Sequence, residues 1–127
     1  MTDLKSYFNE TTGLGVFSTA NAQGEVNSAI YARPHIIDHE NIAFIMRDRL
    51  SHQNLQSNPH AHYLFIEEGQ EYQGVRLSLT KVEESHNQTL IDSLTRRHTT
   101  TADDNDPRLL VTFKVTKSLR LIGAEEK

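Results

Sequence analysis

The segment Ile45-Met-Arg-Asp-Arg-Leu-Ser-His-Gln-Asn-Leu-Gln-Ser-Asn-Pro59 carries the clearest structural signals in this chain. It continues an apolar run over residues 42–46, which predicts a strand that ends at Met46. Residues Ser51 to Ser57 predict a short helix, and Asn58-Pro59 ends it, because proline cannot continue a helix and constrains the residue before it. A strand therefore leads within a few residues into the start of a helix.

Arg47 and Arg49 follow the predicted strand and precede the predicted helix. The first N–H groups of a helix lack partners within it, and the helix dipole is positive at this end, so a phosphate is attracted there. Arginine side chains add paired donors that suit an oxyanion. The pattern indicates a candidate anion site; the alternative is a capped helix start beside two solvated arginines.

Upstream of this segment, the chain predicts a helix and a hairpin. Leu4, Tyr7 and Phe8 have the spacing of one helix face. Asn21-Ala-Gln-Gly24 is a turn signal between two apolar runs, so the strands on either side of it should pair antiparallel. The predicted elements are a helix from about residue 4, strands at 14–20 and 26–33, and a turn at 38–41.

Downstream, the alternation of apolar residues predicts a sheet interrupted by one more helix. The phase of the strand at 72–83 changes after Leu79, because Val82 falls on the opposite parity, and this predicts a bulge. The polar stretch 96–108 predicts an exposed loop. The predicted elements are strands at 60–67, 72–83, 109–115 and 119–122 and a helix at 85–97.

These elements predict a mainly β fold with six or seven strands and two or three short helices. The strands follow one another without long helices between them, which disfavours a parallel, doubly wound sheet. We therefore expect a small closed or nearly closed antiparallel barrel, because closure removes exposed strand edges.

The composition fits one domain over residues 1–127 and excludes several classes of function. The chain has no cysteine, so disulfides, zinc–thiolate sites and thiol nucleophiles are excluded. A net charge of −4 disfavours an electrostatic nucleic-acid binder. No apolar run reaches the ~20 residues of a membrane helix, and the start of the chain lacks an apolar signal core, so we expect a cytoplasmic protein.

Several short motifs follow one another in the order found in a known family. They are Gly15-Val-Phe-Ser-Thr-Ala with Gly24-Glu-Val, Tyr31-Ala-Arg-Pro34, Phe44-Ile-Met46 followed by Asn54-Leu55 and Asn58-Pro59, and Tyr72-Gln-Gly74. Over residues 13–115 this pattern resembles the pyridoxamine 5'-phosphate oxidase-like FMN-binding split-barrel family. The resemblance implies a split barrel that binds FMN through strand ends and the helix that follows them.

The resemblance also implies a set of cofactor-binding residues. By position they are Arg33, Met46, Arg47, Arg49, Ser51 and His52. Arg33 matches a basic phosphate contact on the second strand, and Met46 matches the strand end beside the flavin. Ser51 stands where the family usually has a lysine. Either a nearby arginine supplies the missing charge, or the site is weakened or lost.

We also expect a homodimer with FMN at the subunit interface. The resemblance implies this assembly, and the strand at 42–46 has apolar residues on both faces, with Ala43 and Ile45 opposite Ile42 and Phe44. A small barrel has one interior, so a second apolar face needs another cover, and a two-fold partner is the commonest one.

Three functional interpretations remain open from the sequence. The first is an FMN-dependent oxidoreductase acting on a small molecule, although the chain is short for a full pyridoxamine phosphate oxidase. The second is a haem-handling split barrel, which the seven histidines keep open, and the third is a cofactor-free dimeric barrel. His60 and His62 share a strand face, but two ligands alone make a weak metal site. No nucleophile motif is present, so no catalytic residue is assigned.

Overall fold

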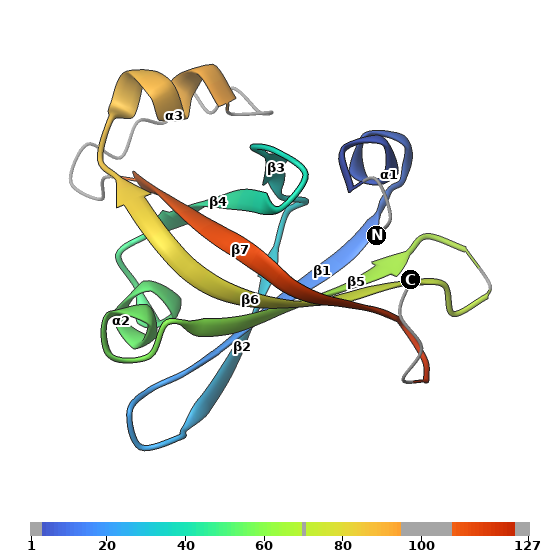
Figure 1. The fold of residues 1–127 in the computed structure, drawn as a ribbon, viewed down its shortest axis with the longest axis horizontal. Coiled ribbons are helices and arrows are strands. Elements are labelled where there is room, and N and C mark those ends of the chain that lie inside the picture. The colour runs from blue at the N-terminus through green and yellow to red at the C-terminus, as the bar shows by residue number, and fades with distance from the viewer. Residues whose placement is uncertain (1–3, 70, 95–107, 124–127) are drawn as a thin grey trace.

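One curled antiparallel sheet forms the frame of the molecule (Figure 1). The computed structural model describes residues 4–69, 71–94 and 108–123, which form seven strands and three short helices. The strands are β1 (Gly13–Ala20), β2 (Val26–Tyr31), β3 (His35–Ile36), β4 (Asn41–Arg47), β5 (His60–Glu67), β6 (Gly74–Ser85) and β7 (Arg108–Arg120). The helices are α1 (Leu4–Glu10), α2 (Leu50–Ser57) and α3 (Gln88–Leu94). The mainly β fold class predicted from the sequence is confirmed.

The strand order explains why the barrel is split. The order β2-β1-β5-β6-β7-β4-β3 places β2 at one edge of the sheet and β3 at the other. Residues 32–34 alone separate these two strands in the chain, so the sheet must curl until its edges lie near each other. The two edges are not hydrogen-bonded neighbours, and a gap between β2 and the β3–β4 edge results.

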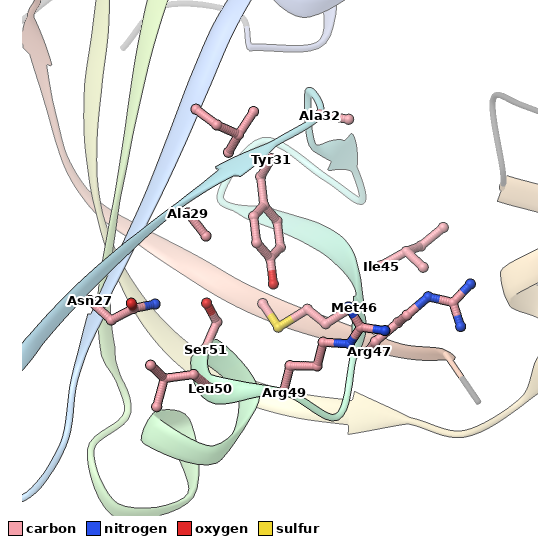
Figure 2. Close-up of a pocket in the computed structure, with 11 residues that line it drawn as sticks. Asn27, Ala29, Tyr31, Ala32, Ile45, Met46, Arg47, Arg49, Leu50 and Ser51 are labelled. Atoms are coloured by element: carbon pink, nitrogen blue, oxygen red, sulfur yellow. The ribbon is translucent and has the colours of Figure 1, made fainter. Parts of the chain in front are cut away.

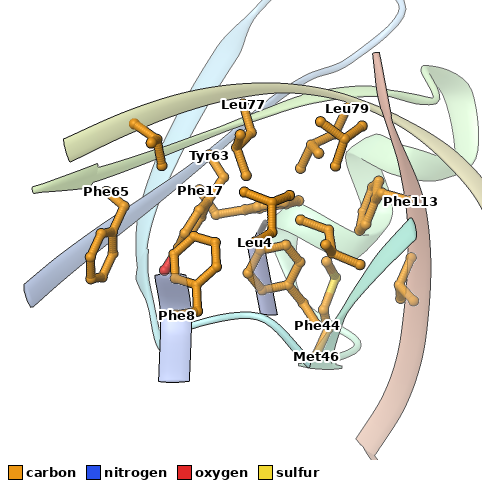
Figure 3. Close-up of a cluster of buried hydrophobic side chains, with 14 of the residues drawn as sticks. Leu4, Phe8, Phe17, Phe44, Met46, Tyr63, Phe65, Leu77, Leu79 and Phe113 are labelled. Atoms are coloured by element: carbon orange, nitrogen blue, oxygen red, sulfur yellow. The ribbon is translucent and has the colours of Figure 1, made fainter. Parts of the chain in front are cut away.

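Aromatic and aliphatic side chains fill the interior of the curled sheet (Figure 3). Phe17, Phe44 and Tyr63 have 0–2% of their surface exposed, and the Phe44 ring lies 5.1 Å from Phe17 and 4.9 Å from Tyr63. Helix α1 adds Leu4 and Phe8 to this cluster. Full burial of such side chains contributes about 1.5–3 kcal/mol each, so this core holds the strands that surround the gap.

Helix α3 covers a second, smaller apolar cluster outside the barrel interior. Ala43 and Leu110 are buried against Ile91 of this helix, with Ile45 and Leu94 packed beside them. From the sequence, a partner subunit was expected to cover the second face of β4. Helix α3 of the same chain covers part of that face instead, so this face is no longer an argument for a dimer. The homodimer itself stays a prediction.

Element boundaries differ from the sequence predictions in a few places. β7 is one continuous strand, where the sequence predicted two, and β2 ends at Tyr31 instead of position 33. The predicted bulge lies at Val82, which the pairing with β7 skips, and a second irregularity lies between Ser78 and Leu79. Helix α3 begins at Gln88 instead of 85, and its predicted end and most of the predicted loop at 96–108 lie outside the described residues. In the described part of the chain, no helix is long and apolar enough to cross a membrane.

Candidate functional site in the split of the barrel

A pocket of about 390 Å³ lies between β2, the end of β4 and the start of α2 (Figure 2). The two strands and the turn from β4 into α2 supply its walls. Its lining residues are Asn27, Ala29, Ile30, Tyr31, Ala32, Ile45, Met46, Arg47, Arg49, Leu50 and Ser51. The pocket therefore occupies the gap that the strand order creates.

A larger pocket of about 750 Å³ continues from the first along the same gap. The two share Ile30, Tyr31, Ala32 and Ile45. The larger one is also lined by the start of β1, by Phe44 on β4, and by three basic residues, Arg33, His35 and Arg108. Both volumes lie in the range of small-molecule sites, and the mixture of apolar walls with a few polar groups is typical of them.

Tyr31 lies at the junction of the two pockets. Its ring stacks on Phe17 with 4.9 Å between centroids, and its hydroxyl points toward Ser51 and Met46 (Figure 2). Burial raises the pKa of Tyr31, although a hydrogen bond with Ser51 works in the opposite direction. The phenol therefore stays neutral at physiological pH and can donate or accept a hydrogen bond in the pocket.

Tyr63 holds the strand end that carries this part of the site. It is fully buried on β5, and its hydroxyl donates to the carbonyl of Ala32 at 3.0 Å. Gly15 on β1 leaves the space for that hydroxyl, because a Cβ at this position would collide with it. The core thus fixes where β2 ends and the gap begins.

The start of α2 forms the basic side of the smaller pocket. Arg49 is the N-cap residue, with an extended backbone, and its own side chain makes no capping hydrogen bond. The backbone N–H of Arg49 donates to the carbonyl of Arg47 at 2.8 Å, which makes the turn from β4 into the helix tight. Two arginines and the first residues of a helix therefore line the same pocket, an arrangement that suits an anion.

The structure brings four of the six sequence-predicted residues together: Met46, Arg47, Arg49 and Ser51 all line the smaller pocket. Arg33 lines the larger pocket instead, because β2 has already ended at Tyr31. One nitrogen of its guanidinium donates to the carbonyls of Phe8 at 2.7 Å and Thr11 at 2.9 Å. This arginine therefore fastens the end of α1 to the barrel.

His52, the sixth predicted residue, does not line either pocket. It is 8% exposed and lies in a charged cluster on another side of α2. Its Nδ1 is 2.8 Å from Oδ1 of Asp48, and its Nε2 is 2.7 Å from Oε2 of Glu84 on β6. Lys81 lies 3.4 Å from the same Glu84 oxygen. This cluster ties the turn, the helix and β6 to one another.

Asn54 and Leu55, part of the motif that carried the family resemblance, anchor α2 from below. Both are buried, and the Asn54 amide donates to the hydroxyl of Thr19 on β1 at 3.0 Å. Leu55 packs into the main core. The motif therefore has a physical role, which is to fix the helix whose start forms the pocket wall.

Arg76 and the pair His60 and His62 do not line either pocket. Arg76 is on the outer face of β6, where its guanidinium donates to the carbonyls of Arg120, at 2.8 Å, and Gly123. His60 and His62 of β5 pair with Thr80 and Ser78 of the neighbouring strand β6. Within the described residues, no group of three or more His, Asp or Glu side chains is placed to hold a metal ion.

Several residues at or near the site were not predicted from the sequence. Asn27, Ala29 and Tyr31 are alternate residues of β2 and so share one face, and this face lines the pocket. The missing information was which face looks into the gap, and that depends on the closure of the sheet. Asp48 and Glu84 had no sequence signal, because they meet His52 only after β6 packs beside α2.

Comparison with known proteins gives the fold a name. No family model and no curated protein matches this sequence. Among solved structures, the chain is similar to an FMN-binding protein from Syntrophomonas wolfei, with a TM-score of 0.74, 20% identity and coverage of 97% of this chain and 86% of that one. It is also similar to HupZ of Group A Streptococcus, with a TM-score of 0.74, 16% identity and coverage of 100% and 98%.

A putative pyridoxamine 5'-phosphate oxidase from Lactobacillus delbrueckii is a third similar structure. Its TM-score is 0.71 at 10% identity, with coverage of 94% of this chain and 93% of that one. Identities this low relate these proteins through their fold. This chain has the split-barrel fold of the pyridoxamine 5'-phosphate oxidase-like FMN-binding proteins.

Proposed function

We propose that this protein binds FMN in the split of the barrel and is a flavin-dependent oxidoreductase acting on a small molecule. The observation that carries the proposal is the smaller pocket, in which Arg47, Arg49 and the start of α2 share one wall. The likeness to an FMN-binding protein of the same fold supports the choice of ligand. FMN, when bound, would supply the redox chemistry, and the protein would supply position and electrostatics.

The residues present fit the phosphate of FMN. Arg47 and Arg49 offer two positive charges, which match a phosphate dianion, and the first N–H groups of α2 add donors. Ser51 stands at the family's lysine position, and its hydroxyl is engaged with Tyr31. The two arginines therefore replace the charge of the usual lysine.

The rest of the gap fits the ribityl chain and the ring system. Ile30 and Ile45 line both pockets, and apolar walls of this kind suit a planar aromatic ligand. Tyr31 presents a neutral hydroxyl at the junction of the pockets, where polar atoms of a ligand need partners. Among the described residues, we assign none as a substrate base.

Titration of the apoprotein with FMN and with riboflavin tests this proposal. Riboflavin lacks the phosphate, so the wild type should bind FMN much more tightly. Arg47→Ala and Arg49→Ala should each weaken FMN about ten- to a hundredfold, because a charge-assisted hydrogen bond contributes roughly 1.5–3 kcal/mol. Lys117→Ala, which removes an exposed charge on β7, should change neither affinity.

Equal affinity for FMN and riboflavin, or full FMN affinity in both arginine variants, would show that the phosphate site is elsewhere. The absorbance of the purified protein separates the remaining alternatives. A flavin spectrum agrees with the proposal, a haem spectrum supports the haem-handling alternative, and a colourless protein that binds neither ligand supports the cofactor-free barrel.

We also propose that the protein is a homodimer through the outer face of β2, β1 and β5. Ile30, Val16 and Leu64 stand opposite one another across these three strands, and Ile30 is 67% exposed. Leu14, beside them on β1, is 48% exposed. Residues opposite each other on neighbouring antiparallel strands share a face, so these side chains form one apolar row. A second copy is the commonest cover for such a row.

Sedimentation of the wild type at micromolar concentration should give a dimer. Val16→Glu places a charge in the middle of the apolar row and should shift the equilibrium to monomer. Val82→Glu is the matched control, because Val82 is 54% exposed at the bulge of β6 and lies outside the row. A monomeric wild type would contradict this part of the proposal.

A further inference from the structure

A charged cluster at the start of α2 contributes no residue to either pocket. It joins three parts of the chain: Asp48 in the turn between β4 and α2, His52 in the first turn of α2, and Glu84 on β6. Lys81 extends it along β6 by its ion pair with Glu84. The side chain of His52 is 10% exposed and that of Glu84 is 22% exposed, so solvent screens their contact less than it screens a surface pair, whereas the Asp48 side chain is 63% exposed.

Both ring nitrogens of His52 lie at hydrogen-bond distance from a carboxylate. Ionised carboxylates accept hydrogen bonds and cannot donate them, whereas a neutral imidazole has one N–H. In the imidazolium form the ring donates to both Asp48, at 2.8 Å, and Glu84, at 2.7 Å, whereas a neutral ring donates to one of them. Gln56, one turn along α2, also lies 3.1 Å from Nε2, and it is uncharged. The charges then alternate from Asp48 through His52 and Glu84 to Lys81.

Asp48 is the member of this cluster that bears on the pocket. It stands between Arg47 and Arg49, so its carboxylate is the nearest acidic group in sequence to the wall proposed to bind phosphate. An uncompensated negative charge there would repel an anionic ligand, and it would also compete for the two arginines. The 2.8 Å contact with Nδ1 of His52 fixes one oxygen of this carboxylate against α2.

We propose that His52 is a positioning residue for the phosphate wall: it neutralises Asp48, holds its carboxylate away from Arg47 and Arg49, and fixes the turn against Glu84. This inference rests on the proposed function, because the phosphate of FMN is the anion concerned. It differs from the role in cofactor contact that the sequence predicted for His52. The side chain acts through Asp48 and touches no ligand.

Four proteins test this role by FMN and riboflavin titration: the wild type, His52→Gln, Asp48→Asn and the double variant. His52→Gln keeps a side chain that can donate one hydrogen bond and removes the charge. It should weaken FMN about five- to tenfold, because the negative charge of Asp48 then stands uncompensated between the two arginines, and it should leave riboflavin unchanged. Asp48→Asn should bind FMN at least as tightly as the wild type.

The double variant gives the decisive measurement. With Asn at position 48 there is no charge left to neutralise. Adding His52→Gln should then weaken FMN less than about threefold, so the double variant should bind FMN more tightly than His52→Gln alone. A residue that merely stabilised the fold would show no such rescue. His86→Gln, which changes an exposed histidine between β6 and α3, is the matched control and should bind both flavins as the wild type does.

Three results would overturn the inference. They are full FMN affinity in His52→Gln, an equal loss of riboflavin and FMN, or a double variant as weak as His52→Gln alone. If the wild type binds neither flavin, the proposed function fails. The role of His52 is then tested by titrating the same four proteins with inorganic pyrophosphate. Pyrophosphate should shift the amide resonances of residues 49–52, and the affinities should rank the four proteins in the order expected for FMN. No shift in the wild type would overturn the inference.

Discussion

Helices α1 and α2 close the two ends of the β1–β5 pair in different ways. Gly13 of β1 pairs with Glu67 of β5 at the end near α1, and Thr19 pairs with Ala61 at the end near α2. Helix α1 buries large apolar side chains among aromatic rings. Helix α2 buries one large apolar side chain, Leu55, together with the polar residues Ser51, His52 and Asn54.

The difference follows from what each helix has to do. Apolar burial is strong but non-directional, so it holds α1 in place, and the hydrogen bonds of Arg33 fasten only its end. Hydrogen bonds have defined distances and angles, and they fix how α2 is rotated and where its first turn points. The start of α2 is a pocket wall, and the start of α1 is not. Changes at the two ends should therefore affect stability and ligand binding separately.

Phe8→Ala should have the largest effect on stability of the changes considered. Phe8 is 1% exposed and makes an edge-on contact with Phe65 at 5.2 Å between centroids. Truncating a buried phenylalanine costs about 3–5 kcal/mol, through lost burial and the cavity that remains. Urea unfolding measures this loss. The α2 pocket should keep its FMN affinity in whatever fraction stays folded, and a selective loss of FMN would contradict the separation of the two ends.

Arg33→Ala should cost about 2 kcal/mol, in the range for hydrogen bonds to charged groups, because it removes the donors to the carbonyls of Phe8 and Thr11. It should weaken FMN much less than Arg47→Ala does. Arg47→Ala should show the opposite pattern, with little change in unfolding and a large loss of FMN. If Arg33→Ala weakened FMN binding much more than riboflavin binding, Arg33 would belong to the phosphate site, as the family resemblance implied.

Asn54→Ala should cost about 1–2 kcal/mol, because the hydroxyl of Thr19 then loses a buried donor. Replacing both partners by apolar residues, as in Thr19→Val with Asn54→Leu, should recover much of this stability. FMN binding should be weakened in Asn54→Ala and also in that double variant, because both lack the hydrogen bond that orients α2. Recovery of both stability and FMN affinity would show that the orientation of α2 does not depend on this bond.

The fold could be predicted further than the site because the two depend on different information. Alternation, turn signals and Asn58-Pro59 are local, and they placed most strands and the helix at the pocket. The separation of β7 into two strands was wrong: residues 116–118 are polar, yet Lys117 pairs with Ser78 and Ser118 pairs with Leu77, so the strand continues. Local polarity does not show where pairing ends.

The site depended on contacts between distant parts of the chain. The positions of Met46, Arg47, Arg49 and Ser51 at a strand end and helix start could be inferred from neighbouring residues alone. Arg33 continued the alternation of β2 in the sequence, but the strand ends two residues earlier. The partners of His52 lie 4 and 32 residues away, and the second contact forms when β6 packs beside α2. A single sequence shows no sign of that packing.

The smallest expected effect is on the pH dependence of stability at the α2 end. Partial burial of Glu84 favours its neutral form, but the hydrogen bond from His52 and the charges of Lys81 and His52 outweigh it, so the pKa of Glu84 is lowered. A carboxyl whose pKa is lower in the folded state stabilises the fold when it is ionised in both states. That contribution is complete above the ordinary carboxyl pKa, and it is lost as the pH falls through the lower, folded-state value.

Glu84→Gln should therefore be less stable than the wild type by under about 1 kcal/mol between pH 6 and 7.5, as for partly exposed ion pairs. The difference should shrink when the pH falls below about 4.5, because the wild type then loses the same charge. Urea unfolding of both proteins across this pH range measures it. Glu83→Gln, one residue away and exposed, is the control and should show no such pH-dependent difference. A Glu84→Gln difference that stayed constant to pH 3 would mean that this carboxylate holds α2 by its shape and hydrogen bonds, and that the charges at this end are dispensable for stability.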